Sequence, residues 1–128
     1  MPTARWDDIY PHIIILEMTP GNTWNELDAI FAQQKAMAAL KEGPVAVILD
    51  VSRSPEPPTS DTITRARNLF MGQPGNIFTW VLVGGNRLSE VMAGVLRSAR
   101  VVRLMTAPTI ASAYMVIDHE MVRVAAQM

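Results

Sequence analysis

The sequence predicts an α/β domain built on a mostly parallel sheet of four to five strands with about four helices. Two unbroken apolar runs, Val45–Val51 and Ile77–Val83, are typical of strands buried on both faces, as in a parallel sheet. The segments around them show helical spacing of apolar residues and are bounded by capping and turn residues. Strands and helices therefore alternate along the chain, and we expect right-handed crossovers between parallel strands.

The N-terminal segment predicts a strand pair, or one strand with a bend, between Trp6 and Met18. Asp7-Asp8 favours a turn, and Tyr10–Met18 is strand-like because it contains four consecutive apolar residues. We expect the core of this strand near residues 11–18.

A capping box predicts where the first helix begins. Pro20-Gly21-Asn22 is a turn, and Thr23-Trp24-Asn25-Glu26 has the Ser/Thr-x-x-Glu pattern that satisfies two backbone donors at a helix start. The helix should end near Lys41, before Gly43-Pro44. Its apolar residues at helical spacing predict one buried stripe: Leu27, Ile30, Phe31, Met37 and Ala38.

Two more helices should follow the two apolar strands. After the proline-rich loop Ser52–Pro58, a helix should start at Thr59–Asp61 and continue to about Met71. The next helix should cover Leu88 to about Ala99. Its predicted inward residues are Val91, Met92, Val95 and Leu96.

The C-terminal part predicts a short strand and a last helix. Val101–Thr106 is more polar than the other strands and should lie nearer an edge of the sheet. A helix should then begin near Thr109 or Ile110. Because its apolar residues cover more than one face, we predict that it is deeply buried or shared with a second copy in a homodimer, for which Met121 and Val122 are the test positions.

Composition favours one globular domain spanning residues 1–128, with 49% apolar and 18% charged residues. The chain has no cysteine, which excludes thiolate metal sites and thiol nucleophiles, and its apolar stretches are too short to span a bilayer. The net charge of −1 gives no general attraction to nucleic acid. We expect a cytoplasmic protein, with no nucleic-acid partner and no membrane span.

The charges are distributed unevenly along the chain. Residues 1–50 hold three Lys and Arg against seven Asp and Glu, whereas residues 51–128 hold eight Arg against five Asp and Glu. Chance combined with solvated helix faces is the simpler interpretation. The alternative is an arginine-lined face that meets an acidic or phosphorylated partner, since guanidinium groups bind such anions in a bidentate way.

The candidate site lies where the two apolar strands end, because sites on parallel sheets lie just past the carboxyl ends of the strands. Two strand ends and two helix starts should converge there, next to backbone N–H groups that favour an anion. The candidate residues for a partner, an anion or a phosphoryl group are Asp50, Ser52, Arg53, Thr59, Ser60, Gly84, Gly85, Asn86 and Arg87. Helix capping without further function is the preferred interpretation of Thr59, Ser60 and Asp61, although a capping position can also stabilise a phosphate.

Several of these segments together resemble the STAS domain, and in particular small stand-alone SpoIIAA-like proteins related to anti-sigma-factor antagonists. The resemblance rests on Trp6, on Asn22–Glu26, on Ile48–Ser52, on Trp80–Arg87 and on the helix start at Thr109–Tyr114. It implies the SpoIIAA-like fold and a role in signalling.

The same resemblance implies a phosphoacceptor hydroxyl at the start of the second helix. Signalling STAS domains carry Asp-Ser-Ser/Thr-Gly there, and the matching positions of this chain are Pro58-Thr59-Ser60-Asp61. Thr59 and Ser60 match as hydroxyl residues, whereas the preceding Asp and the following Gly of the motif are missing.

The functional expectation is a non-enzymatic STAS-like module that binds a protein partner. No Ser-His-Asp spacing, metal motif or other catalytic constellation is present, so we expect no enzyme activity, no cofactor and no metal. The alternative is a small-ligand or lipid carrier of the CRAL-TRIO type, a fold that STAS domains resemble.

Overall fold

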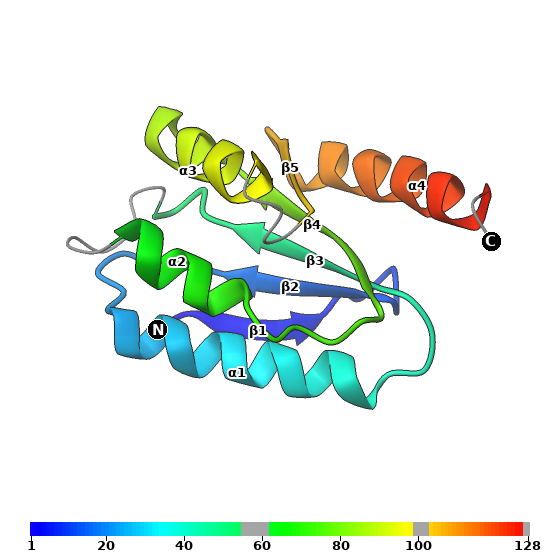
Figure 1. Cartoon of the computed structure of the whole chain (residues 1–128), viewed down its shortest axis with the longest axis horizontal. Helices are drawn as coiled ribbons and strands as arrows, with labels where there is room; N and C mark the ends of the chain where they lie inside the picture. Colours follow the sequence, from blue (N-terminus) through cyan, green and yellow to red (C-terminus); the bar gives the residue numbers. More distant parts are fainter. Residues whose placement is uncertain (55–61, 99–102, 127–128) are drawn as a thin grey trace.

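The computed structural model describes residues 1–54, 62–98 and 103–126, and these form a sheet with helices on both of its faces (Figure 1). The strands of the described part are β1 (Thr3–Trp6), β2 (Ile13–Glu17), β3 (Val45–Asp50), β4 (Ile77–Val83) and β5 (Leu104–Ala107). Its helices are α1 (Trp24–Leu40), α2 (Thr62–Phe70), α3 (Arg87–Ser98) and α4 (Ile110–Ala126). The predicted α/β class is confirmed.

The five strands lie in sequence order, β1-β2-β3-β4-β5. β1 is antiparallel to β2, and each later strand is parallel to the one before it. The two apolar runs are therefore parallel neighbours as predicted, with Val47 opposite Trp80. A hairpin can join antiparallel strands, whereas each parallel pair needs a helical crossover, and this accounts for the positions of α1, α2 and α3.

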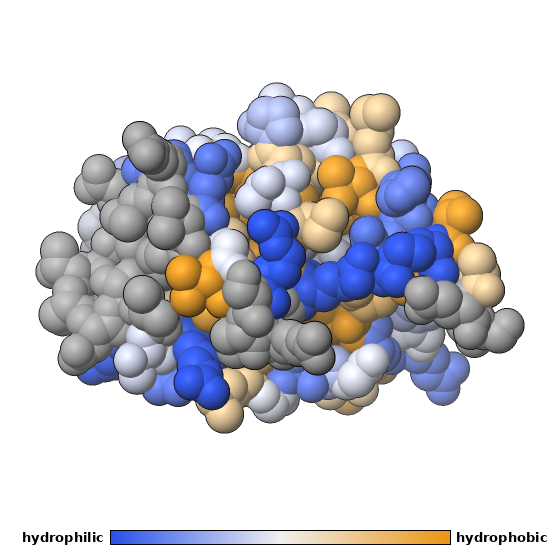
Figure 2. Space-filling model, turned by 45° about the horizontal axis from the view of Figure 1, so that its top comes forward, coloured by the Kyte–Doolittle hydropathy of each residue, from blue (hydrophilic) through white to orange (hydrophobic). Residues whose placement is uncertain are grey.

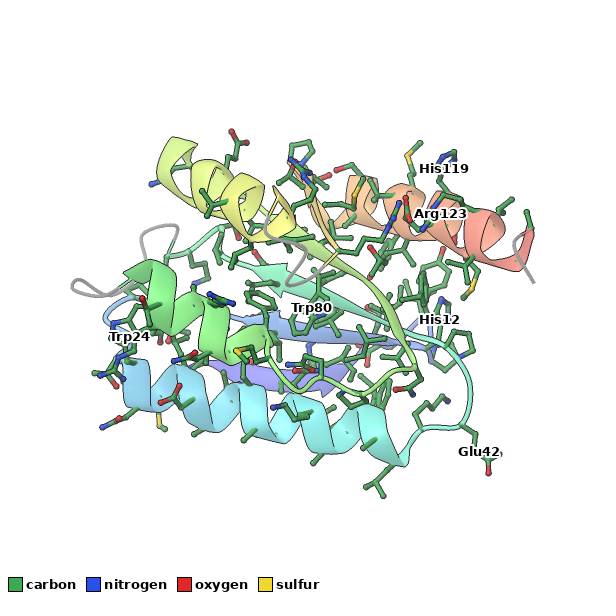
Figure 3. All side chains as sticks on the ribbon, viewed as in Figure 1. His12, Trp24, Glu42, Trp80, His119 and Arg123 are labelled. Atoms are coloured by element: carbon green, nitrogen blue, oxygen red, sulfur yellow. The ribbon has the colours of Figure 1, made fainter. Side chains whose placement is uncertain are left out.

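The crossovers place three helices on one face of the sheet. Successive right-handed crossovers that all advance in the same direction put their helices on the same side. The core on this side contains residues from α1, α2 and α3, and its centre is an aromatic cluster. The Phe31 ring stacks on Trp80 with centroids 5.6 Å apart, and Phe70 meets Trp80 edge-on at 4.8 Å (Figure 3).

The opposite face is covered by α4. Ala113 and Ile117 of this helix are fully buried and belong to a second core with Ile48 and Val81. Figure 1 shows α4 on the far side of the strands from α1. The helix exposes Val122 and half-buries Met121, so self-association through α4 stays a prediction.

The capping box of α1 is present as predicted. The Thr23 hydroxyl accepts from the Glu26 backbone N–H at 3.2 Å, and the Glu26 carboxylate accepts from the Thr23 backbone N–H at 3.2 Å. Leu27, Ile30 and Phe31 are buried, which confirms the predicted inward stripe.

Apart from shifts of one residue at other element ends, the predicted details differ from the structure in three places. The second strand of the N-terminal pair begins at Ile13 rather than Tyr10, because residues 7–12 form the turn. The last strand is Leu104–Ala107, one residue beyond the predicted end, and residues 101 and 102 lie outside the described part. Val95 was predicted to be inward but is exposed, since α3 turns Ala93 and Leu96 toward the sheet.

In the described part, no helix is long and apolar enough to cross a bilayer.

Candidate functional site

Three strand ends meet at one edge of the sheet, as the sequence predicts for parallel strands. β3 ends at Asp50, β4 at Val83 and β5 at Ala107. The segments that follow them, Asp50–Ser54, Gly84–Asn86 and Thr106–Pro108, are here called the carboxyl-edge surface. Its geometry decides which of the candidate residues can act together.

Asp50 and Ser52 are bonded to each other. The Asp50 Oδ1 atom accepts from the Ser52 backbone N–H at 3.0 Å and from the Ser52 hydroxyl at 2.6 Å. This arrangement is an Asx turn, in which a carboxylate replaces a backbone acceptor and fixes the chain direction after a strand. The pair therefore orders the start of the loop, and Arg53 is exposed beside it.

Gly84 brings the loop after β4 against the loop after β3. Its φ is +72°, and a Cβ atom at this position would lie 2.5 Å from the Ser52 Cβ and 2.8 Å from the Ser52 Cα. Both the left-handed backbone and the close contact require a residue without a side chain. The Gly84 N–H also donates to the Ala107 carbonyl at 3.2 Å, which links it to the end of β5.

The start of α3 lies directly after these glycines. The Asn86 carbonyl accepts the first helical hydrogen bond, from the Glu90 N–H at 3.0 Å, and Arg87 begins the helix. Of the predicted residues, Asp50, Ser52 and Gly84–Asn86 are thus brought to one edge. Thr59 and Ser60 lie outside the described residues.

A pocket of about 280 Å³ lies beside Gly84. It is lined by Leu82, Gly84, Gly85, Glu90, Thr106, Ala107 and Pro108. Sequence reasoning missed Glu90, Thr106 and Pro108. Two of them could have been identified from the sequence, because Glu90 falls in the first turn of the predicted helix and Thr106 ends a predicted strand. The Glu90 carboxylate also weighs against a free anion in this pocket, since like charges repel.

A second polar cluster, absent from the sequence prediction, lies on the α4 side of the sheet. The buried Asp7 carboxylate accepts from the Tyr114 hydroxyl at 2.7 Å and from two backbone N–H groups of its own turn. The Tyr10 ring packs on Tyr114 with centroids 4.7 Å apart, and His12 meets Tyr10 edge-on at 6.2 Å. The cluster ties the β1–β2 turn to α4.

The hydrogen bonds of this cluster keep Asp7 ionised and Tyr114 neutral. Burial raises the pKa of the Asp7 carboxyl, but the hydrogen bonds from the Tyr114 hydroxyl and two backbone N–H groups outweigh it, and the pKa lies below its ordinary value. Burial and the hydrogen bond to Asp7 raise the pKa of Tyr114 to about 12. A tyrosine held in this way is a structural donor rather than an acid catalyst.

Replacing Tyr114 by phenylalanine should lower the free energy of unfolding by about 1–3 kcal/mol, because Asp7 would stay buried with one hydrogen bond fewer. Tyr10→Phe is the matched control, since the described residues make no hydrogen bond with the Tyr10 hydroxyl, and its effect should stay within about 0.5 kcal/mol. Urea denaturation measures both. Equal losses in the two variants would contradict the role given to Asp7.

Metal ligands do not gather in the part of the chain that the structure describes: no group of three or more His, Asp and Glu residues is placed to hold an ion. In comparison with known proteins, no family model, no curated protein and no solved structure matches the chain.

Proposed function

We propose that the chain is a non-enzymatic, STAS-like protein-interaction module in cytoplasmic signalling or regulation, and that it binds its protein partner through the carboxyl-edge surface. The observation that carries the proposal is the fixed contact between three loops. Gly84 touches Ser52 on one side and donates to Ala107 on the other. A surface held in one arrangement before binding loses little conformational entropy when a partner docks.

The pocket supports recognition of a partner side chain. Its volume of about 280 Å³ lies just below the range of roughly 300–1,000 Å³ that is typical of small-molecule pockets. Its lining offers the backbone of two glycines, the Thr106 side chain and one carboxylate. A short segment of a protein could insert one side chain here while the surrounding loops contact its backbone.

Binding is better supported than catalysis at this surface. The Asp50 carboxylate accepts two hydrogen bonds from Ser52 of the same turn, so its role is structural. Among the described residues that line the pocket, Glu90 supplies the ionisable side chain and Thr106 supplies the hydroxyl. A catalytic site needs such groups in mutual hydrogen-bond contact with a base or an orienting partner.

The carrier hypothesis receives less support from the packing of α4. A lipid carrier needs an apolar cavity, and α4 is the helix that the sequence suggests as its cover. Ala113 and Ile117 are fully buried between α4 and the sheet, where they pack with Ile48 and Val81. Protein side chains thus occupy the space that a lipid would need at this position.

Replacing Thr106 by arginine should strongly reduce binding of the protein partner, because Thr106 is exposed and its larger, charged replacement would fill the pocket without entering the core. We expect the amount of partner captured by the immobilised chain to fall by at least about tenfold. Gln33→Arg is the control, because Gln33 is exposed on α1 and the charge change is the same. Quantitative mass spectrometry of the captured proteins measures the difference.

Two outcomes would reject the proposed function. The first is that the Thr106→Arg and wild-type chains capture the same proteins in equal amounts. The second is that Gln33→Arg loses capture to the same extent as Thr106→Arg. Thermal melting of both variants controls for unfolding.

The predicted anionic group at this surface has a separate test. In a phosphate titration followed by residue-resolved NMR, the amides that follow Ser60 and Gly85 should shift, because backbone N–H groups at helix starts favour an anion, and α3 starts at Arg87. Shifts confined to the opposite ends of the strands would contradict it. Arg87→Ala should weaken any phosphate binding that is found.

A further inference from the structure

Three arginines from three separate segments gather on the side of the molecule formed by α3, β5 and α4. Arg97 lies in the last turn of α3, Arg103 directly precedes β5, and Arg123 lies in the last turn of α4. These three residues are here called the arginine surface. Figure 2 shows a strip of strongly hydrophilic colour crossing this side of the molecule toward α4.

A buried carboxylate holds two of the arginines in place. Glu120 is only 3% exposed, and its Oε2 atom accepts from the Arg103 Nε at 2.7 Å and from the Arg123 Nε at 3.1 Å. Arg103 makes a second bond, from Nη2 to Oε1 at 3.3 Å. Burial raises the pKa of Glu120, but the two guanidinium groups outweigh it and lower the pKa below its ordinary value. The carboxylate therefore stays ionised and fixes both guanidinium groups.

The third arginine, Arg97, is held by β5, the outermost strand of the sheet. Arg97 donates from Nη1 to the Leu104 carbonyl of β5 at 3.3 Å. A charged side chain at this position also protects an edge strand against pairing with another chain. All three guanidinium groups are thus ordered before any ligand arrives.

The arginines keep hydrogen-bond capacity after these contacts. A guanidinium has five N–H donors, and in the described part of the structure three guanidinium groups lie here with the single buried carboxylate of Glu120. The Arg103 and Arg123 side chains remain 45% and 34% exposed. Within the described residues, no other carboxylate forms an ion pair with any of the three. The surface therefore presents excess positive charge and unused donors to solvent.

The outer face of α4 carries exposed apolar side chains on the same helix as Arg123. Val122 is 69% exposed and Met115, two turns earlier, is 72% exposed, and the exposed Asp118 lies between them on this face. Arginine and methionine are enriched in protein–protein interfaces, where guanidinium groups meet carboxylates and apolar groups exclude water. The combination suits a protein ligand better than a polyphosphate backbone.

We propose that the arginine surface, together with Val122 and Met115, binds an acidic segment of a protein partner through carboxylate–guanidinium pairs. The small number of arginines and the net charge of −1 disfavour nucleic acid, since binding to it commonly uses about 6–10 phosphate contacts. Planar guanidinium groups match carboxylates in a bidentate way. Three of the eight arginines between residues 51 and 128 lie on this surface.

This second surface is separate from the carboxyl-edge surface. Arg103 directly precedes β5, whereas the pocket residue Thr106 lies near the end of this strand. A variant can therefore lose binding at one surface and keep it at the other. In particular, Thr106→Arg should leave binding at the arginine surface within about twofold of the wild type, because it touches none of the three arginines.

A hexaglutamate peptide labelled with fluorescein tests the proposal by fluorescence anisotropy. The wild-type chain should bind it saturably and more weakly as salt is added. The double variant Arg97→Gln, Arg123→Gln should bind at least about fivefold more weakly, since two charged contacts are lost. The matched control is Arg65→Gln, Arg67→Gln, which removes the same charge from exposed positions on α2 and should change the affinity less than about twofold.

A third variant keeps the test decisive if the double variant is poorly folded. Val122→Glu leaves all three arginines in place and changes an exposed residue, so it should fold normally and weaken peptide binding through charge repulsion. Far-ultraviolet circular dichroism checks the fold of every variant.

Four results would overturn the proposal. They are no saturable peptide binding by the wild type, equal losses in the two double variants, and tighter binding of a single-stranded oligonucleotide of the same charge. The fourth is a dimer in light scattering that Val122→Glu dissociates, because a second copy of the chain would then cover α4 in place of an acidic segment.

Discussion

Replacing Gly84 by alanine should lower the free energy of unfolding by about 2–5 kcal/mol, a large effect for the addition of one methyl group. Two costs add at this position. A left-handed backbone costs a non-glycine residue about 1–2 kcal/mol. The new Cβ would also lie 2.5 Å from the Ser52 Cβ and 2.8 Å from its Cα, so the backbone of one loop must move, at about 1–3 kcal/mol.

Gly43→Ala separates these two costs. Gly43 has a φ of +93°, and a Cβ there would meet no atom within 4 Å. Its replacement should therefore cost only the backbone term, about 1–2 kcal/mol. Urea denaturation gives both values. If the two variants lose the same stability, the contact between the two loops is not as close as described, and the carboxyl-edge surface loses its fixed geometry.

Acidification should destabilise the protein, and Glu120 should be one main cause. The ordinary pKa of this carboxyl is 4.5, and its pKa in the folded chain is lower. A group of this kind stabilises the fold above its unfolded pKa, and its contribution is lost as the pH falls through the folded value. Asp7, with an ordinary pKa of 3.8 that folding also lowers, acts in the same direction. Stability should thus decline below roughly pH 4.5.

Glu120→Gln should remove part of this pH dependence. At neutral pH we expect a loss of about 1–3 kcal/mol, below the usual cost of breaking a buried ion pair because both arginines are partly exposed. The difference from the wild type should shrink as the pH falls and the wild-type carboxyl becomes protonated. Glu42→Gln is the control, because Glu42 is exposed in the loop after α1, whereas Glu120 lies on α4, which covers the opposite face of the sheet. Figure 3 shows Glu42 beyond the end of α1 and Arg123, an ion-pair partner of Glu120, on α4. A constant difference at all pH values would contradict the role of Glu120.

The parts of the fold that sequence predicts well are those determined by local patterns. Val45–Val51 and Ile77–Val83 could be recognised as parallel strands because their apolar runs leave no solvent-facing side. Thr23 and Glu26 could be recognised as a helix start because the capping box is completed within four consecutive residues. The position of Gly84 beside the β3 loop followed from the general geometry of parallel sheets.

The parts that sequence missed depend on distant contacts. Glu120 follows Asp118-His119 and has the composition of a solvated helix face, but the rotation of α4 turns it inward, where Arg103 reaches it across 17 positions of sequence. Asp7 and Tyr114 are 107 positions apart. The prediction that Val95 points inward was wrong for a related reason. The apolar residues of α3 form two adjacent stripes at helical spacing, and contact with the sheet determines which stripe is buried.

In the described part of the chain, α4 is the helix that covers the second face of the sheet, and this has a consequence for synthesis of the chain. Translation produces β2, β3 and β4 before α4, so an apolar face that includes Ile13, Ile15, Ile48 and Val81 has no cover until residues after Ile110 have left the ribosome. An uncovered apolar face of this kind binds chaperones or aggregates. A premature stop codon before Ile110 should therefore yield insoluble product even though the whole sheet has been made.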